Sequence, residues 1–106
     1  SWLVGVLAAE DRRLLVAEED GVLVGTVRAD LSGGVYELSW TVYPDARGRG
    51  VGKCIVALTA AQILEPILAK IKSDNISSVR IAEHAGMAFE REVNGVLHYS
   101  RPAQKQ

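Results

Sequence analysis

Cysteine is nearly absent from the chain, which contains a single one, Cys54, among 106 residues. A lone cysteine cannot form an internal disulfide, so we expect a reducing, cytoplasmic location. The N-terminus has no basic leader that would indicate a signal peptide. Apolar runs are short, and none approaches the roughly 18 residues of a membrane span. We therefore expect no membrane partner.

An excess of positive charge is missing as well. Twelve Lys and Arg residues stand against thirteen Asp and Glu residues, for a formal net charge of -1. This balance argues against a nucleic-acid-binding protein, which usually carries a basic surplus. Apolar residues make up 48% of the chain, which is enough for a packed core. We expect a single domain over residues 1–106.

Turn signals divide the first half of the chain into strands. Asp20-Gly21 lies between the strand-like residues 14–18 and 22–29, and both positions of such a tight hairpin favour a positive φ. Ser32-Gly33-Gly34 marks a second turn, and residues 35–43 read as the next strand. These runs predict an antiparallel meander of three strands. Ahead of them, the spacing of apolar residues predicts that residues 2–9 are the end of a helix.

The pattern changes in the second half. Residues 51–64 are predicted to be helical, with an apolar stripe of Val51, Ile55, Leu58 and Ala61, and Pro66 is expected to end this helix. Residues 67–72 read as a strand. The order strand, helix, strand predicts a right-handed crossover between parallel strands.

A second helix and a hairpin complete the predicted fold. Asn75 is expected to be the N-cap of the helix, and Gly86 the glycine just past its end. Residues 88–93 and 96–101 flank Asn94-Gly95, a second strong hairpin signal. The sequence therefore predicts an α+β fold with a mixed, mostly antiparallel sheet and one β-α-β crossover.

Residues 47–53 (RGRGVGK) join the predicted strand 35–43 to the predicted helix. A glycine-rich loop at the start of a helix points backbone N–H groups at one place, at the positive end of the helix dipole. Two arginines and a lysine add cationic side chains. We expect a phosphate-bearing ligand here, whereas the alternative is a tight turn that uses glycine for its geometry alone.

Two familiar phosphate loops do not fit these residues. A nucleotide-triphosphate loop reads G-x-x-x-x-G-K-[ST], but Arg47 stands at the first glycine and Cys54 at the hydroxyl that binds Mg²⁺. A dinucleotide fingerprint reads G-x-G-x-x-G, and no residue after Gly52 completes it. The pattern [QR]-x-x-G-x-[GA] does fit, at Arg47, Gly50 and Gly52.

This last pattern resembles the pyrophosphate loop of the GNAT superfamily of N-acetyltransferases. Residues 41–53 (TVYPDARGRGVGK) are similar to that family's strand end and loop, and residues 75–87 (NISSVRIAEHAGM) are similar to its second characteristic block. The likeness covers most of the chain. Complete members begin with a strand and two helices before the hairpin, so the resemblance implies that these elements are missing here.

The resemblance implies that acetyl-CoA is the cosubstrate. Main-chain amides of the loop would bind its pyrophosphate, and the pantetheine arm would lie along residues 40–43. A backbone N–H near Val42 would stabilise the oxyanion of the reaction. The implied cofactor-binding residues are Val42, Arg47, Gly48, Arg49, Gly50, Val51, Gly52, Lys53, Asn75 and Ser78.

The catalytic residues are less clearly marked. Glu37 resembles the general base of several members, and the alternative is a solvated carboxylate at the edge of the sheet. Many members carry a tyrosine as general acid where this chain has Ala82; Ser78, Tyr99 and Cys54 are the substitutes we consider. Cys54 is otherwise expected to pack in the core. No cluster of His or Cys indicates a metal site.

The function implied by the resemblance is transfer of an acetyl group to a primary amine of a small molecule, with an amino sugar as the leading choice, by direct attack in a ternary complex. One alternative is a non-catalytic acyl-CoA-binding module, and another is a protein or peptide N-acetyltransferase. A purely structural or partner-binding domain is a further alternative, in which the loop binds nothing. A homodimer is common in the family and is an option here.

Overall fold

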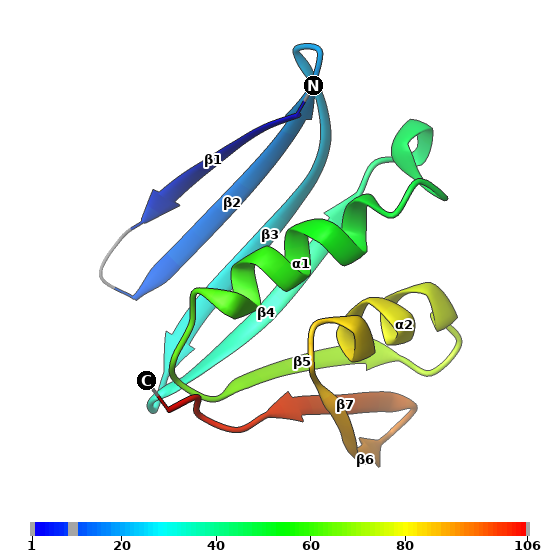
Figure 1. Ribbon diagram of the computed structural model, residues 1–106. Coiled ribbons are helices and arrows are strands. Elements are labelled where there is room, and N and C mark those ends of the chain that lie inside the picture. Colours follow the sequence, from blue (N-terminus) through cyan, green and yellow to red (C-terminus); the bar gives the residue numbers. More distant parts are fainter. Residues whose placement is uncertain (1, 9–10, 106) are drawn as a thin grey trace.

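The computed structural model describes residues 2–8 and 11–105, which form one seven-stranded sheet with two helices on the same face (Figure 1). The spatial order of the strands is β1-β2-β3-β4-β5-β7-β6. The helices are α1 (Val51–Ala61) and α2 (Ile76–His84), and Pro44–Ala46 form a short 3-10 turn. The strands are β1 (Trp2–Ala8), β2 (Arg12–Glu19), β3 (Val22–Ser32), β4 (Val35–Val42), β5 (Ile67–Lys72), β6 (Ala88–Val93) and β7 (Val96–Arg101).

The pairing of the strands confirms the predicted α+β class. Strands β1 to β4 form an antiparallel meander, β5 pairs antiparallel with β7, and β6 and β7 form a hairpin. The parallel pair is β4 with β5, joined through α1 as the crossover. None of the helices in the described part of the chain is long and apolar enough to cross a membrane.

Each predicted hairpin turn is present. Asp20-Gly21, Gly33-Gly34 and Asn94-Gly95 all have positive φ at both positions, between 51° and 80°. Two-residue turns of this kind match the right-handed twist of the strands that they join. Local turn chemistry therefore sets the register next to each turn, and irregularities shift it further along in the β2–β3 and β6–β7 pairs.

The prediction of a helix end over residues 2–9 is wrong where the structure describes it. Residues Trp2–Ala8 form a strand that pairs with β2 along its whole length, from Trp2 opposite Glu19 to Ala8 opposite Arg13. Residue 9 lies outside the described residues. The run is almost entirely apolar, so its spacing cannot distinguish a helix from a strand. The meander therefore has four strands rather than three.

Helix α1 differs from its prediction in length and in its buried face. It ends at Ala61, well before Pro66, so proline does not end it. Leu58 and Ala61 of the predicted stripe are exposed, and so is Cys54, which was expected in the core. The residues that the helix buries are Val51, Gly52, Ile55, Val56, Thr59 and Ala60. The buried face differs from the predicted one because α1 packs against α2 as well as against the sheet.

The core lies between the sheet and the two helices. Leu38 of β4, Val27 of β3 and Ile55 of α1 are among its largest fully buried side chains. Helix α1 sits close on β3, because a Cβ at Gly25 would lie 2.9 Å from Ile55 Cδ1. The absence of a side chain there lets the helix rest directly on the strand.

Arg101 fastens the C-terminal end of α1 to the sheet. Its side chain is buried at the end of β7 and donates to the carbonyl oxygens of Ala60 (2.6 Å), Ile63 (2.6 Å) and Glu65 (3.1 Å). Burial lowers the pKa of the Arg101 guanidinium from its usual value. The contacts neutralise the negative end of the helix dipole and hold the connection between α1 and β5.

Candidate functional site

The candidate site begins where β4 and β5 separate. The two strands pair only at Tyr36 with Ile67 and at Glu37 with Leu68. Beyond this point they diverge, as Figure 1 shows for the cyan-green β4 and the yellow-green β5. A gap therefore opens in the middle of an otherwise continuous sheet.

The backbone of β4 presents groups to this gap that pair with no neighbouring strand. The β3–β4 hairpin closes with Ser32 opposite Val35, and the N–H of Tyr43 still donates to Val24 O at 3.0 Å. Hydrogen-bonded positions alternate along an antiparallel pair, so odd-numbered residues of β4 bond to β3. The N–H and C=O groups of Trp40 and Val42 therefore point away from β3, towards the gap. They form a short edge strand inside the sheet.

The loop after β4 leads directly into the first turn of α1. Gly48 has φ 81° and Gly50 has φ 76°, in the left-handed region where glycine has no steric penalty. The first helical hydrogen bond is from Cys54 N to Gly50 O at 3.1 Å. The N–H groups of Val51, Gly52 and Lys53 are therefore left without an intrahelical acceptor, at the positive end of the helix dipole.

Gly52 has a different role from the glycines before it. A Cβ at this position would lie 2.5 Å from Ile81 Cδ1 of α2 and 3.0 Å from Val42 Cγ2 of β4. Gly52 is buried, and its lack of a side chain lets the start of α1 approach both elements. The third glycine of the loop thus sets the spacing of the three walls of the site.

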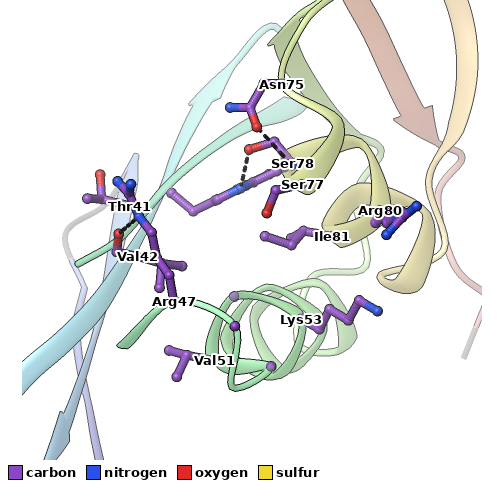
Figure 2. A pocket seen from close by; sticks show the side chains of 14 residues that line it. Thr41, Val42, Arg47, Val51, Lys53, Asn75, Ser77, Ser78, Arg80 and Ile81 are labelled. Carbon is purple, nitrogen blue, oxygen red and sulfur yellow. Dashed lines mark hydrogen bonds between the residues drawn. The ribbon is translucent and has the colours of Figure 1, made fainter. Parts of the chain in front are cut away.

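The start of α2 forms the opposite wall. Asn75 caps this helix as predicted, because its Oδ1 accepts a hydrogen bond from Ser78 N at 3.1 Å. The Ser78 hydroxyl in turn accepts a hydrogen bond from Trp40 Nε1 at 3.2 Å. This bond crosses from β4 to α2, and Figure 2 shows both contacts of Ser78 as dashed lines.

These elements enclose a cavity of about 820 Å³. Its walls come from the end of β4, the glycine loop with the first turn of α1, and the first turns of α2. The residues that line it are Trp40, Thr41, Val42, Arg47, Gly48, Gly50, Val51, Gly52, Lys53, Asn75, Ser77, Ser78, Arg80 and Ile81. A volume of this size falls in the usual range of small-molecule and cofactor sites.

The cations near the loop have different partners. Arg47 Nε donates to the carbonyl oxygen of Val42 at 3.1 Å, one of the backbone groups that face the gap. Arg49 turns away and forms an ion pair with Glu19 at 2.7 Å. Figure 2 shows Arg47 running beside Val42, while Lys53 and Arg80 extend from α1 and α2. Positive charge therefore lies on several sides of the loop amides.

Most of the predicted cofactor-binding residues meet at this cavity. All of them line it except Arg49, which lines a separate cavity with Glu19 and Tyr43. Trp40 and Thr41, from the stretch expected to carry the pantetheine arm, also line the site, and so do Ser77, Arg80 and Ile81, which were not predicted. The helical spacing of Ser77, Arg80 and Ile81 is the signal that could have indicated them, because residues three and four apart share a helix face.

The predicted catalytic residue lies at the closed end of the gap rather than among the lining residues. Glu37 belongs to the last β4–β5 pair, and its carboxylate faces Lys70 Nζ at 3.5 Å with 48% of each side chain exposed. Ala82, at the position where a tyrosine is common, is completely buried. Of the substitutes considered, Ser78 lines the cavity, whereas Tyr99 is buried against Phe89 and Cys54 is exposed outside it.

No group of three or more His, Cys, Asp or Glu side chains in the described part of the chain is arranged to hold a metal ion. The groups that line the cavity are backbone amides and carbonyl groups, hydroxyls and cationic side chains. Oriented amides at a helix start favour an anion, and an unpaired strand edge favours an extended chain with amide groups.

Comparison with known proteins gives a consistent result. The model of the acetyltransferase (GNAT) family matches residues 2–87. No curated protein sequence matches the chain closely enough to count as a relative.

Several solved structures share the fold. The GNAT domain of S. lividans PAT superposes with a TM-score of 0.75 at 23% identity, covering 86% of this chain and 60% of that one. Spermidine N-acetyltransferase from Vibrio cholerae, in complex with CoA and spermine, gives 0.72 at 19% identity, covering 87% and 66%. Phosphinothricin acetyltransferase from Sinorhizobium meliloti, in complex with acetyl-CoA, gives 0.71 at 21% identity, covering 88% and 62%. The chain thus spans less than two thirds of the length of each.

The close approach at Gly52 leads to a prediction about stability. Replacing Gly52 by Ala would push Ile81 and Val42 apart, and we expect it to lower the free energy of unfolding by about 2 kcal/mol, as overpacking usually does. Ile81→Val removes the Cδ1 atom that clashes, so the double variant should recover part of this loss. Urea denaturation of the single and double variants measures both effects.

Gly5→Ala is the matched control for Gly52→Ala, because a Cβ at Gly5 meets nothing within 4 Å. Its free energy of unfolding should stay close to that of the wild type. Alanine favours a helix by up to about 1 kcal/mol over glycine. A Gly52→Ala variant as stable as the wild type, or more stable, would show that the three walls are not in the contact described.

Proposed function

Because the chain belongs to the GNAT family of acetyltransferases, we propose that it binds acetyl-CoA in the gap between β4 and β5 and transfers the acetyl group to a primary amine of a small molecule. One observation carries this proposal: two features lie side by side in the structure. They are the amides at the start of α1 that have no intrahelical acceptor, and the backbone edge of β4 that pairs with no strand. The first suits a diphosphate and the second suits an amide-containing arm.

The diphosphate end of the ligand fits the loop. The N–H groups of Val51, Gly52 and Lys53 would donate to its oxygens, and the left-handed Gly48 and Gly50 leave the approach free of side chains. Arg47, Lys53 and Arg80 would neutralise its charge. Arg49 is the exception among the residues expected here, since it is held by Glu19.

The pantetheine arm would lie along β4 as an added strand. Trp40 and Val42 offer backbone groups at the spacing of alternate strand residues, and Asn75 and Ser78 supply polar side chains from the other wall. Arg47 occupies the Val42 carbonyl in the structure described here. It would have to release this oxygen when the arm binds, and the diphosphate offers it a stronger, charged partner.

The reaction in the gap needs few groups. The N–H of Val42 would stabilise the oxyanion that forms when the amine attacks the thioester carbonyl. Glu37, exposed at the last β4–β5 pair, would take the proton of the attacking amine through water. Ala82 has no proton to give, so a general acid would be Ser78 or would not be needed, because a thiolate is a weakly basic leaving group.

The acceptor amine would approach the gap from the side away from the helices. The side chains of Glu37 and Lys70 lie on the sheet face opposite the helices, where the amine would enter. An amino sugar is our leading acceptor, and the complex of the Vibrio cholerae enzyme with spermine makes a polyamine a second one.

We propose that residues 1–106 act as one cytoplasmic domain, with a homodimer as an option.

A non-catalytic acyl-CoA-binding module is the second candidate. It is favoured by the full burial of Ala82, which removes the usual position of the general acid from the cavity. It predicts CoA binding without acetyl transfer. A protein or peptide acceptor is a further alternative, and an acceptor panel that includes peptide amines distinguishes it.

Calorimetry with CoA tests the ligand, and Gly50 provides the variant. Alanine in the left-handed region costs about 1–2 kcal/mol, so Gly50→Ala should relax the loop and weaken CoA binding about tenfold. Gly33→Ala is the matched control, because Gly33 also has positive φ and open space but lies in the β3–β4 turn. It should lose stability yet keep its affinity for CoA.

A wild-type chain that binds no CoA contradicts the proposal and leaves a structural or partner-binding domain. An equal loss of affinity in Gly50→Ala and Gly33→Ala would place the ligand elsewhere.

Thiol release from acetyl-CoA with a panel of amines tests the reaction. Glu37→Gln keeps the size of the side chain but removes the base, and it should lower the turnover rate by at least about a hundredfold at unchanged CoA affinity. Asp30→Asn is the control on the same sheet face, where Asp30 faces Glu37 from β3 but is held by Arg12 and Arg28 at 2.7 Å each. Full activity of Glu37→Gln would show that this carboxylate is not the general base. If the wild type binds CoA but turns over no amine, the result would favour the binding module.

A further inference from the structure

Trp40 has a position in the cavity that the binding of CoA does not require. It is half-buried, packs against the core and lines the cavity, and its indole N–H donates to Ser78 Oγ at 3.2 Å. This bond joins β4 to α2 across the site. A large flat side chain therefore spans two walls of a cavity that otherwise has small or flexible lining residues.

The order of residues along β4 tells which end of the cavity Trp40 occupies. The loop amides that fit the diphosphate follow the end of β4, next to Val42. An arm that runs inward from the loop along this edge passes Val42 first and Trp40 next. It can go little further, because β4 and β5 are already paired at Glu37 and Leu68. Trp40 thus lies just inward of the Val42 N–H that would bind the thioester oxygen, where the acyl group would extend.

We propose that the indole of Trp40, held by Ser78, closes the acyl end of the cavity and restricts the donor to short acyl groups, with acetyl preferred over longer chains. This inference rests on the proposed function, because it assumes that a CoA thioester occupies the gap. It adds a residue that determines acyl-chain length to a site whose other residues would bind CoA or take part in the transfer.

The physical basis is the stiffness of the indole and the polar bond at its edge. A tryptophan has only two side-chain torsions, and a hydrogen bond to a residue on another element restrains both of them. A longer acyl chain would have to displace the ring and break this bond. One surplus methylene in a filled pocket already lowers binding about tenfold or more. Butyryl and hexanoyl chains add two and four methylenes to acetyl.

Calorimetry with CoA, acetyl-CoA, butyryl-CoA and hexanoyl-CoA tests the inference without requiring turnover. The wild type should bind hexanoyl-CoA at least about tenfold more weakly than acetyl-CoA. Trp40→Ala opens the inner end, so the ratio of the two dissociation constants should fall close to one. Ser78→Ala removes only the hydrogen-bond acceptor and should give an intermediate ratio.

Phe89→Ala is the matched control, since Phe89 is an aromatic side chain on β6 with 55% exposure and does not line the cavity. It should keep the wild-type ratio. If Trp40→Ala does not fold, Trp40→Leu and Trp40→Phe provide the same comparison with a core-compatible side chain, and each should raise the relative affinity for butyryl-CoA.

Two outcomes separate this inference from the proposed function. If the wild type binds none of the four compounds, both the proposed function and this inference are wrong. If CoA binds but the wild type does not discriminate against hexanoyl-CoA, or if a folded Trp40 variant keeps the wild-type ratio, the inference alone is overturned.

Discussion

The separation of β4 from β5 is the constraint on which the rest of the structure depends. A parallel pair that continued along both strands would satisfy the backbone of β4 and leave nothing for a ligand. Here the pairing stops after Glu37 and Leu68, so the N–H and C=O groups of Trp40 and Val42 are left facing a gap. The same divergence makes room for the start of α1 at one end and for the first turns of α2 along one side. A single break in the sheet thus creates both a strand edge and a cavity.

Packing keeps this break open. Gly52 lets the start of α1 contact Val42 of β4 and Ile81 of α2 at once, which fixes the distance between the walls. At the other end of α1, Arg101 binds three carbonyl oxygens and ties the helix to β7. The helix is therefore held at both ends, by close packing at the loop and by hydrogen bonds at the far side. Its dipole consequently points in one direction, with its positive end at the mouth of the cavity.

Local chemistry made much of this predictable from the sequence. Asp20-Gly21 and Asn94-Gly95 specify tight turns by themselves, and Asn75 specifies a helix start, so these elements were placed correctly. Resemblance to a family supplied the role proposed for the loop. What the sequence could not show was contact between distant residues. The ion pair of Arg49 with Glu19, thirty residues earlier in the chain, and the hydrogen bond from Trp40 to Ser78 are contacts of this kind.

The remaining errors come from patterns with more than one solution. The apolar run Trp2–Ala8 fits a strand as well as a helix, and pairing with β2 decides for the strand. In α1 nearly every side chain is apolar, so spacing alone could not tell that α2 would cover one flank and leave Leu58 and Cys54 exposed. Tertiary packing therefore determines which face of α1 is buried, and the sequence pattern alone does not.

The claim that β4 offers its backbone edge to the ligand is tested most directly by NMR of the backbone amides during a titration with acetyl-CoA. The account predicts that the amides of Trp40, Val42 and Val51 to Lys53 shift together, and that hydrogen exchange at Trp40 and Val42 slows when acetyl-CoA is bound. Binding of acetyl-CoA that leaves the exchange of these two amides unchanged would contradict the account.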